Sequence, residues 1–531
     1  MASTLVLAAL ALVGFVFWRL VHNFFVASPF DNIPGPAPGS IWAGHMLQLF
    51  DHNNWDFVRD MVETYGPAAK FQSFLGKKLL QIADPKAMHS ILVKDQDSYS
   101  RGEPSEVLGQ LLLGPGLFST FDVQHKRQRK MLTPVFNAAY LRGITPTFYS
   151  IAGKLRNAIS AQVQNTTTEV DMVAWMGRAA LEIVGQGGLG HSFDPLVEET
   201  KNEYTEAVKQ FVPAFGDIAH VRIFLPIVKY LGPSEFRRKL LDYVPDRKVQ
   251  RMKVLTYAVY EKSKAIFEAK KAAIDGGDQE LMHNIGEGKD VMSILLRENL
   301  MASQADKLTD EELLAQMATF IVAGVDTTSN AMAHVLQLLA EHPGAQTQLR
   351  NEVHAAQETY GDEIPFDEVM ALPYLDAICR ETLRLWAPVG FVGRTAVADT
   401  VLPLSEPLRG RDGTMVSEIA VPKGSPMFLN LRAWRPARWL APLPKTVEDA
   451  RIPGIYSHLT TFLSGGHSCV GFKFSQLEMK VILATLVSAF KFERSSKPIV
   501  WNFAPVSYPS TSYDRSQPEM FLNVTRLSDG R

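Results

Sequence analysis

Residues 462–471 read Phe-Leu-Ser-Gly-Gly-His-Ser-Cys-Val-Gly, and an amphipathic run from Phe474 to Phe490 follows them. This glycine-rich loop delivers one cysteine, Cys469, to the start of a predicted helix, where the partial positive charge of the helix end lowers a thiol's pKa. The glycines let the backbone approach a flat group closely, and free N–H groups can hydrogen-bond the sulfur. A single thiolate ligand to haem iron needs these features. The alternative is a buried structural cysteine.

The composition narrows the class of protein. The chain has 531 residues, of which 46% are hydrophobic and 21% charged, and this excludes a disordered, collagen-like or multi-span membrane protein as a whole. The formal net charge of −2 gives no global electrostatic reason to expect a nucleic acid partner. The two cysteines, Cys379 and Cys469, are too few for a disulfide scaffold or a four-cysteine zinc site, and their scarcity fits a reducing compartment.

The N-terminal segment is apolar from Thr4 to Val21, apart from Thr4 and Arg19. A helix of this length rises about 27 Å, close to the ~30 Å hydrocarbon core of a bilayer. The segment lacks the basic start of a cleaved signal peptide, which is the alternative, and Trp18 and Arg19 suit an interfacial flank. A proline-rich stretch follows and stiffens the chain. We therefore expect a transmembrane anchor over 1–22, a hinge over 23–45 and a cytosolic domain over 46–531.

Helical periodicity dominates the remaining chain, so we predict one large, mainly helical domain with a small β component. The predicted helices are Trp55–Tyr65, Pro85–Val93, Val123–Phe136, Thr147–Val163, Val170–Val184, Lys248–Ala273, Asp290–Asn299, Thr309–His342, Gly344–Tyr360, Tyr374–Trp386 and Val470–Phe490. The predicted strands are Ala69–Leu75, Leu79–Ile82, Thr395–Val397, Val401–Leu402 and Met427–Leu431. A domain of this size exceeds the usual single core, which suggests that it wraps a bulky group.

Two motifs are similar to sites of other enzyme classes. Residues 185–190 match G-x-G-x-x-G, but a helical pattern precedes them and none follows, which favours a glycine-rich helix end over a dinucleotide site. Residues 466–470 are similar to a hydrolase nucleophile elbow, but Val470 stands where the second glycine should be. We therefore predict neither a dinucleotide site nor a hydrolase.

A second polar motif lies in the middle of the long helix predicted over 309–342. Residues 323–328 read Ala-Gly-Val-Asp-Thr-Thr, and helical spacing puts Phe320, Ala323 and Thr327 on one face. Small residues at 323 and 324 leave room for a diatomic ligand, which the Thr327 hydroxyl can hydrogen-bond, and Asp326 can relay protons from solvent. The alternative for a helical threonine is a hydroxyl that is solvated or bonded back to its own helix.

A third motif is the pair Glu381 and Arg384, which lie three residues apart on a predicted helix. Exposed ion pairs of this spacing are common and contribute only ~0.3–0.5 kcal/mol. Taken alone, the pair therefore indicates no function.

In this order, the three motifs resemble those of the cytochrome P-450 haem-thiolate monooxygenases, specifically the membrane-anchored microsomal type with a fungal character. The family's loop F-x-x-G-x-R-x-C-x-G is matched at 462, 465, 469 and 471, and its motif A-G-x-D-T-T is matched in full by residues 323–328. Its E-x-x-R pair falls on Glu381 and Arg384, and the resemblance implies Arg438 as the third member of that structural triad. It therefore implies a cytochrome P-450 fold behind the N-terminal anchor.

The resemblance also implies a site. The metal ligand is Cys469, and the catalytic residues are Thr327 and Asp326. The implied cofactor-binding residues are His125, Arg129, Ala323, Arg394, Phe462, Gly465, His467 and Gly471. Among them, His125 and Arg129 correspond to the family's W-x-x-x-R propionate motif, and Arg394 corresponds to its later propionate arginine.

The chain departs from the family pattern in three places. His467 replaces the usual arginine of the cysteine loop, and His125 replaces the usual tryptophan. Between Ala433 and Trp434 the chain lacks a short helix that the family normally carries. This short join affects the placement of Arg438 and the binding of haem.

The implied activity is a haem b-dependent monooxygenase that inserts one atom of O₂ into a lipophilic small molecule and reduces the other to water. Electrons come from an NADPH-cytochrome reductase, with cytochrome b5 as an optional donor. The expected location is the endoplasmic reticulum membrane, in contact with lipid and without nucleic acid. One alternative is a non-catalytic form, haem-binding or misfolded because of the short join. Another is a haem-thiolate protein that uses peroxide or isomerises its substrate, against which the Asp326–Thr327 pair argues.

Overall fold

The computed structural model describes residues 21–429, 454–512 and 517–527, with gaps at 52, 165, 197–202, 219, 222–223, 229, 233, 276–289 and 457–458, and also Gly14 and Trp18. The chain forms two compact units. Unit 1 contains Met1–Gly102, Phe391–Leu431 and Pro444–His467, and unit 2 contains Glu103–Gly390, Arg432–Leu443 and Ser468–Arg531. No helix within the described residues combines the length and the apolar character needed to cross a bilayer. The anchor predicted over 1–22 falls almost wholly outside these residues.

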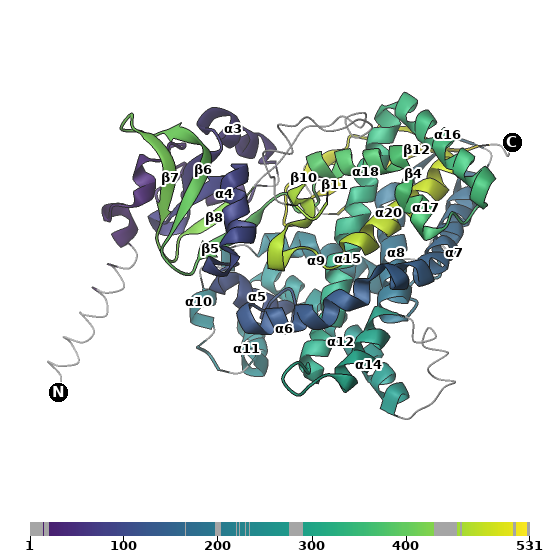
Figure 1. Cartoon of the computed structure of the whole chain (residues 1–531), viewed down its shortest axis with the longest axis horizontal. Helices are drawn as coiled ribbons and strands as arrows, with labels where there is room; N and C mark the ends of the chain where they lie inside the picture. Colours follow the sequence, from purple (N-terminus) through teal and green to yellow (C-terminus); the bar gives the residue numbers. More distant parts are fainter. Residues whose placement is uncertain are drawn as a thin grey trace. The chain divides into compact units, whose positions relative to one another are not determined.

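Unit 1 is built on a five-stranded sheet with the order β1-β2-β8-β5-β3 (Figure 1). Its strands are β1 (Ala68–Gln72), β2 (Lys78–Ile82), β3 (Tyr99–Ser100), β5 (Val392–Ala396) and β8 (Pro426–Leu429). The strands β2 and β8 pair in parallel, and the other neighbours pair antiparallel. A separate ribbon pairs β6 (Thr400–Arg409) with β7 (Met415–Val421). The sheet thus joins segments that lie more than 300 residues apart in the sequence.

Short helices complete unit 1. They are η1 (Pro29–Asn32), α2 (Met46–Leu49), α3 (Trp55–Tyr65), η2 (Phe74–Gly76), α4 (Pro85–His89), η3 (Ser90–Lys94), η4 (Gln96–Ser98), η11 (Thr460–Phe462) and η12 (Gly465–His467). The carboxylate of Asp84 caps α4 by accepting from the Ala87 N–H, and it also accepts from the Ser405 N–H of β6. The buried core of unit 1 includes Leu80, Ile82 and Met427. The Asp84 carboxylate therefore fixes both the start of α4 and the strand β6.

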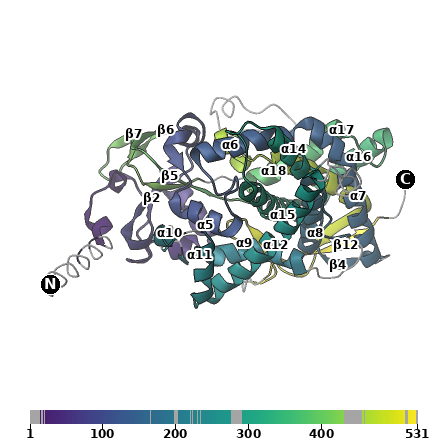
Figure 2. The ribbon, with the colours of Figure 1, turned by 90° about the horizontal axis from the view of Figure 1, so that it is seen from below.

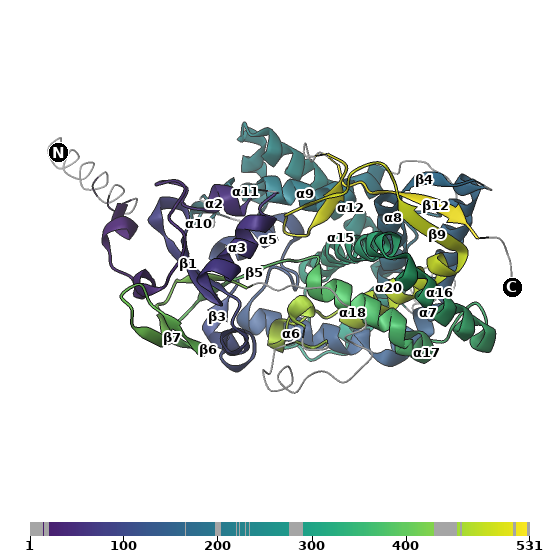
Figure 3. The same cartoon turned by 90° about the horizontal axis from the view of Figure 1, so that it is seen from above.

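Unit 2 is helical. Its helices are α5 (Glu103–Leu113), α6 (Asp122–Leu132), η5 (Thr133–Phe136), α7 (Ala138–Val163), α8 (Met172–Ile183), η6 (Val184–Leu189), α9 (Glu203–Asp217), α10 (Leu225–Val228), α11 (Ser234–Leu240), η8 (Leu241–Tyr243), α12 (Arg247–Asp275), α14 (Val291–Met301), α15 (Asp310–Glu341), α16 (Pro343–Tyr360), α17 (Phe366–Ala371), α18 (Pro373–Leu385) and α20 (Phe472–Ala489). The long helix α15 packs against α8, α9, α12, α18 and α20, and it lies among the helices of this unit in both Figure 2 and Figure 3.

Small sheets flank these helices. One has the order β4-β12-β9, formed by β4 (Thr168–Asp171), β9 (Phe490–Arg494) and β12 (Phe521–Arg526). The other pairs β10 (Val500–Asn502) with β11 (Tyr508–Ser510). The β12 strand pairs antiparallel with both β4 and β9, so the C-terminal strand lies between strands from two distant segments.

The start of α15 is fixed by a capping box, in which Thr309 and Glu312 satisfy each other's backbone N–H groups. Glu312 is buried and also accepts hydrogen bonds from the side chains of α6, at 2.8 Å from Gln124 Nε2 and 3.0 Å from Gln128 Nε2. Arg127 Nη2 donates to the same carboxylate at 2.5 Å. This one glutamate therefore holds α6 against the N-terminal end of α15.

The predicted helices all appear in the structure, and Trp55–Tyr65 has the predicted bounds. The prediction that a helix begins at Thr147 was wrong, because α7 begins at Ala138 after an Asn137 cap and continues through Pro146. Val170 belongs to β4, because Asp171 caps α8 and ends the strand. The strand predicted at 401–402 extends over Thr400–Arg409 since it pairs with β7, which the sequence did not predict.

Residues 185–190 end a helix, as predicted. The segment η6 is a π-helical continuation of α8, and Gly190 closes it with φ of 60°, in the left-handed region that glycine adopts at low cost. The fully buried Glu182 accepts from the Phe193 and Asp194 N–H groups, both at 2.8 Å, and from Ser192 Oγ at 2.6 Å. This carboxylate, and not a phosphate, binds the N–H groups that follow the glycines.

Replacing Glu182 tests this role. We expect Glu182→Ala to lower the free energy of unfolding by about 3 kcal/mol, because two buried N–H groups and one hydroxyl lose a charged acceptor. Denaturant unfolding measures the difference. Glu268→Ala, which removes an exposed glutamate of α12, is the control and should change the value by less than ~0.5 kcal/mol. Equal losses in the two variants would contradict the role of Glu182.

Candidate functional site

The part of the cysteine loop that belongs to unit 1 packs closely on η3 and η4. A Cβ on Gly465, whose φ is 65°, would lie 2.1 Å from the carbonyl oxygen of Leu92. The Gly466 N–H donates to Gln96 Oε1 at 2.6 Å. The neighbouring backbone therefore requires glycine at 465. The sequence predicts a flat ligand close to this glycine and does not predict the contact with Leu92. Phe462 lies edge-on to Tyr456, with ring centroids 5.8 Å apart.

Cys469 lies just before α20, as predicted. Its sulfur accepts a hydrogen bond from the Gly471 N–H, and Gly471 is the residue that precedes the helix. The side chain is exposed, but the protein around the thiol desolvates it and raises its pKa, and this effect outweighs the lowering by Gly471 and by the charge of Arg129. The predicted lowering of the pKa by the helix start is therefore present in the Gly471 N–H, but desolvation outweighs it.

Arg129 binds the cysteine loop. Its Nη1 donates to the Ser468 carbonyl oxygen at 2.5 Å and its Nη2 donates to Ser468 Oγ at 2.8 Å. Partial burial lowers the pKa of Arg129, and the charge of Cys469 raises it. His125 is buried one turn earlier on the same helix, α6. The structure thus brings Arg129 to the residue next to Cys469.

One face of α15 is open along an otherwise buried helix. Ala323 is exposed, and Phe320, Gly324 and Thr327 are half-buried, whereas most of their neighbours on the helix are buried. The positions i, i+3, i+4 and i+7 form one stripe, which confirms the predicted face. The Thr327 hydroxyl donates to the Ala323 carbonyl oxygen at 2.7 Å. The Thr327 side chain therefore adopts the alternative arrangement, in which its hydroxyl bonds back to its own helix. The hydroxyl oxygen can still accept a hydrogen bond from another group.

Gly324, at the edge of this stripe, contacts a neighbouring segment. A Cβ at this position would lie 2.7 Å from Cγ2 of Val184, the first residue of η6. The space that the sequence assigns to a diatomic ligand at 324 is thus filled by the valine. Of the two small residues, only Ala323 lies fully on the open face.

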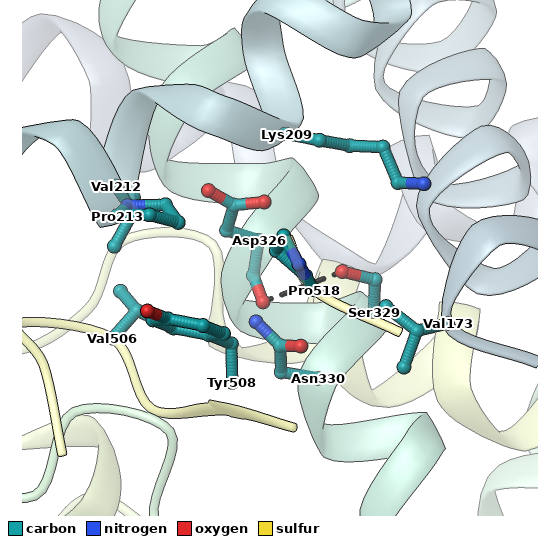
Figure 4. Close-up of a pocket in the computed structure, with 10 residues that line it drawn as sticks. All are labelled: Val173, Lys209, Val212, Pro213, Asp326, Ser329, Asn330, Val506, Tyr508 and Pro518. Atoms are coloured by element: carbon teal, nitrogen blue, oxygen red, sulfur yellow. Dashed lines mark hydrogen bonds between the residues drawn. The ribbon is translucent and has the colours of Figure 1, made fainter. Parts of the chain in front are cut away.

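Asp326 is buried, and its Oδ2 atom has no hydrogen-bond partner. Desolvation raises the pKa of this carboxyl to about 8, and the charge of Lys209 opposes the shift. The carboxyl lines a small pocket with about 10 Å³ of internal space, which is also open to solvent (Figure 4). The pocket is lined by Val173, Lys209, Val212, Pro213, Asp326, Ser329, Asn330, Val506, Tyr508 and Pro518. Asp326 is thus largely protonated at pH 7 and contacts solvent-accessible space, as a proton relay requires.

Glu381 and Arg384 form a bidentate pair on α18, with N–O distances of 2.8 and 3.0 Å. Glu381 is fully buried, so the pair is not the exposed, weak kind that the spacing alone suggests. Arg438, the implied third member, lies outside the described residues, as do Ala433 and Trp434.

Unit 1 contains a buried arginine, Arg394, and a half-buried one, Arg101, that the sequence did not link. Desolvation and, to a lesser extent, the charge of Arg101 lower the pKa of Arg394 to about 10, and desolvation lowers the pKa of Arg101 to about 10. Arg394 Nη2 is buried without a hydrogen-bond partner. Two like charges with an orphaned donor favour an anionic ligand. Sequence reasoning missed Arg101, because the strand that precedes it, β3, was not predicted and its pairing with β5, which contains Arg394, follows only from the fold.

These features fit a haem. The exposed Cys469 sulfur beside an N–H donor and a guanidinium suits an iron-bound thiolate. The orphaned Nη2 of Arg394 suits a propionate carboxylate. Within the described residues, no cluster of His, Cys, Asp and Glu could hold a metal ion by itself.

Comparisons with known proteins agree with this chemistry. The cytochrome P-450 family model matches residues 34–508. The chain is 47% identical to cytochrome P-450 monooxygenase 91 of Postia placenta, over 96% of each chain, and 45% identical to a ganoderic acid synthetase of Ganoderma lucidum, over 99% of each. The second alignment has 544 positions, which exceeds this chain's 531 residues by 13, so the relative has residues without a counterpart here. These matches favour the catalytic interpretation over the non-catalytic alternative.

The contact of Gly324 with Val184 gives a stability test. We expect Gly324→Ala to lower the free energy of unfolding by about 2 kcal/mol, because the new Cβ overlaps Val184 Cγ2. Val184→Ala removes that methyl group, so the double variant should lose less than the two single losses together. Thermal unfolding of the four proteins measures the coupling. Strictly additive losses would contradict the proposed overlap.

Proposed function

Because the chain belongs to the cytochrome P-450 family, we propose that this haem-dependent monooxygenase oxidises a lipophilic small molecule with electrons from an NADPH-cytochrome reductase. The observation that carries the proposal is the position of Cys469, an accessible sulfur at the start of α20 that accepts from the Gly471 N–H beside Arg129. A thiolate ligand favours cleavage of the O–O bond, and bound haem supplies the oxygen activation.

The cofactor in this proposal is haem b, whose iron the Cys469 thiolate would bind. Arginines and histidines would hold its propionates by charge and hydrogen bonds: His125 and Arg129 of unit 2, and Arg101, Arg394 and His467 of unit 1. The other contacts are apolar or close-packed: Ala323, Phe462, Gly465 and Gly471. The Glu381–Arg384 pair, with Arg438, supports the fold around the cofactor.

Thr327 and Asp326 handle protons in this proposal. Asp326 holds a proton at neutral pH, since desolvation raises its pKa to about 8, and its carboxyl faces the solvent-accessible pocket. The Thr327 oxygen accepts a hydrogen bond on the open face of α15 while its own hydrogen is donated to Ala323. Consecutive helical residues point about 100° apart, so Asp326 lies on the pocket side of α15 and Thr327 on its open side. In this proposal, protons pass between the two sides through this pair.

The proposed setting is the endoplasmic reticulum membrane, with the anchor over 1–22 holding the domain on the cytosolic face, and with cytochrome b5 as an optional donor. A lipophilic substrate suits such a location because it partitions into the bilayer. The ganoderic acid synthetase of Ganoderma lucidum is one relative whose name indicates the product it makes. A peroxide-dependent enzyme is the second candidate, and a reductase requirement separates the two.

The two cysteines provide a matched test of the iron ligand. We expect Cys469→Ser to abolish the red-shifted Soret band that a thiolate-ligated haem gives when reduced and bound to CO, because an alcohol is a poor ligand. Cys379→Ala, which changes the buried cysteine of α18, should retain the band. Loss of the band in both variants, or in neither, would rule out Cys469 as the ligand.

The pH dependence tests Asp326. We expect the fraction of NADPH consumption that yields product to fall as the pH rises through about 8, because the carboxyl loses the proton that it donates. Asp326→Asn should give low coupling at all pH values and remove this decline. Product and hydrogen peroxide, measured together across pH 6 to ~9, report the coupling. A wild-type decline that persists unchanged in Asp326→Asn would exclude Asp326 as its source.

A further inference from the structure

The open face of α15 ends at a stacked group of aromatic side chains. His334 stands at i+7 from Thr327, so helical spacing puts both residues on the same stripe as the exposed Ala323. His334 is nevertheless only 5% exposed. Side chains from other segments must therefore cover the stripe beyond Thr327.

Trp386 and Trp501 cover this histidine. The His334 ring is nearly parallel to both indoles, with interplanar angles of 17° to Trp386 and 12° to Trp501. Its centroid lies 4.8 Å from the Trp386 ring centroid and 3.6 Å from that of Trp501. Two indoles do not fit on one face of an imidazole ring at these distances, so His334 lies between them. Such ring pairs stabilise a fold beyond the apolar area that they bury.

The two tryptophans belong to different segments of unit 2. Trp386 directly follows α18, and Trp501 is the middle residue of β10. Nε1 of Trp501 also donates a hydrogen bond to Gln337 Oε1 of α15 at 2.7 Å. The stack therefore attaches both the end of α18 and the β10–β11 hairpin to the same stretch of α15.

The hairpin continues from the stack toward Asp326. The Ser507 N–H donates to the Pro388 carbonyl oxygen at 2.8 Å, which ties the hairpin to the chain that follows α18. Val506 lines the same small pocket as Asp326 (Figure 4). Because the hairpin contacts α15 at both places, a displacement of Trp501 would move the chain that packs beside Asp326.

We propose that His334 is a positioning residue that closes the open face of α15 and so limits the length of the lipophilic molecule that this face accepts. Its ring fills the space between the two indoles, and the indoles hold two segments against the helix. The open stretch from Phe320 to Thr327 is about 10 Å long at the rise of an α-helix, and the stack forms its end. This inference rests on the proposed function, since it takes the open face as the place where the substrate lies.

The test measures this length limit in the full-length, haem-loaded protein with N-alkylimidazoles of increasing chain length, whose spectral shift gives a dissociation constant. In wild type the constant should fall about fourfold per added methylene up to a limiting length and then stay level. We expect His334→Ala to extend the limit, so that the first chain beyond the wild-type limit binds about fourfold more tightly to the variant. An unchanged limit in His334→Ala would overturn the proposal.

Two further variants separate the position of the ring from general packing. His334→Phe keeps a flat ring between the indoles and should retain the wild-type limit, whereas a limit extended as far as in His334→Ala would contradict the role of the ring. His354→Ala removes an exposed histidine of α16 and is the control that should change nothing.

Trp501→Leu tests the stack from its other side. Losing one indole should extend the limit as His334→Ala does, and the double variant should extend it no further, because both changes open the same end of the face. Fully additive extensions would overturn the assignment to one stack. If His334→Ala does not bind haem, Trp501→Leu decides, and an unchanged limit there overturns the proposal.

Turnover distinguishes this inference from the proposed function. If wild type shows no reductase-dependent oxidation of a lipophilic library, but His334→Ala extends the length limit, the proposed function fails and the role of His334 stands. If turnover is present and wild type and His334→Ala share one limit, the inference fails alone.

Discussion

The structure depends on the balance of charge at one sulfur atom. Desolvation by the surrounding protein opposes a thiolate at the exposed Cys469, and the Gly471 N–H and the Arg129 guanidinium favour it. Desolvation is the larger effect on the thiol itself, whereas a metal ion deprotonates a coordinating thiol outright. The protein's contribution is therefore to hold the sulfur accessible and to supply a donor and a positive charge beside it. Both come from rigid elements, since Arg129 lies on α6 and Gly471 directly precedes α20.

The long helix α15 has two sides with different physical properties. One side is open at Ala323 and carries the back-bonded hydroxyl of Thr327. The other side buries Asp326 next to a pocket, where desolvation keeps a proton on the carboxyl. Val184 packs against Gly324 and fixes α15 against η6. Glu312 ties the start of α15 to α6, the helix that also binds the cysteine loop, so both parts of the site in unit 2 share one support.

The sequence could predict what depends on spacing. A cysteine before a helix, a stripe at 320, 323 and 327, and a helix end at 185–190 all follow from local patterns, and each is present. It could not predict what depends on neighbours from distant segments. Three such features depend on the packed chain. They are the contact of Gly324 with Val184, the effect of the Arg101 charge on Arg394, and the desolvation that raises the pKa of Cys469. Helical spacing assigns a residue to a face of its helix, but it does not identify the residue of another segment that packs on that face.

X-ray absorption at the iron edge of the haem-loaded, full-length protein tests the account most directly. The account predicts one sulfur scatterer among the ligands of the iron, present in the resting protein and retained on reduction under CO, because Cys469 is the accessible thiol beside the Gly471 N–H and Arg129. A first shell that contains only nitrogen and oxygen would contradict it, whatever activity the preparation shows.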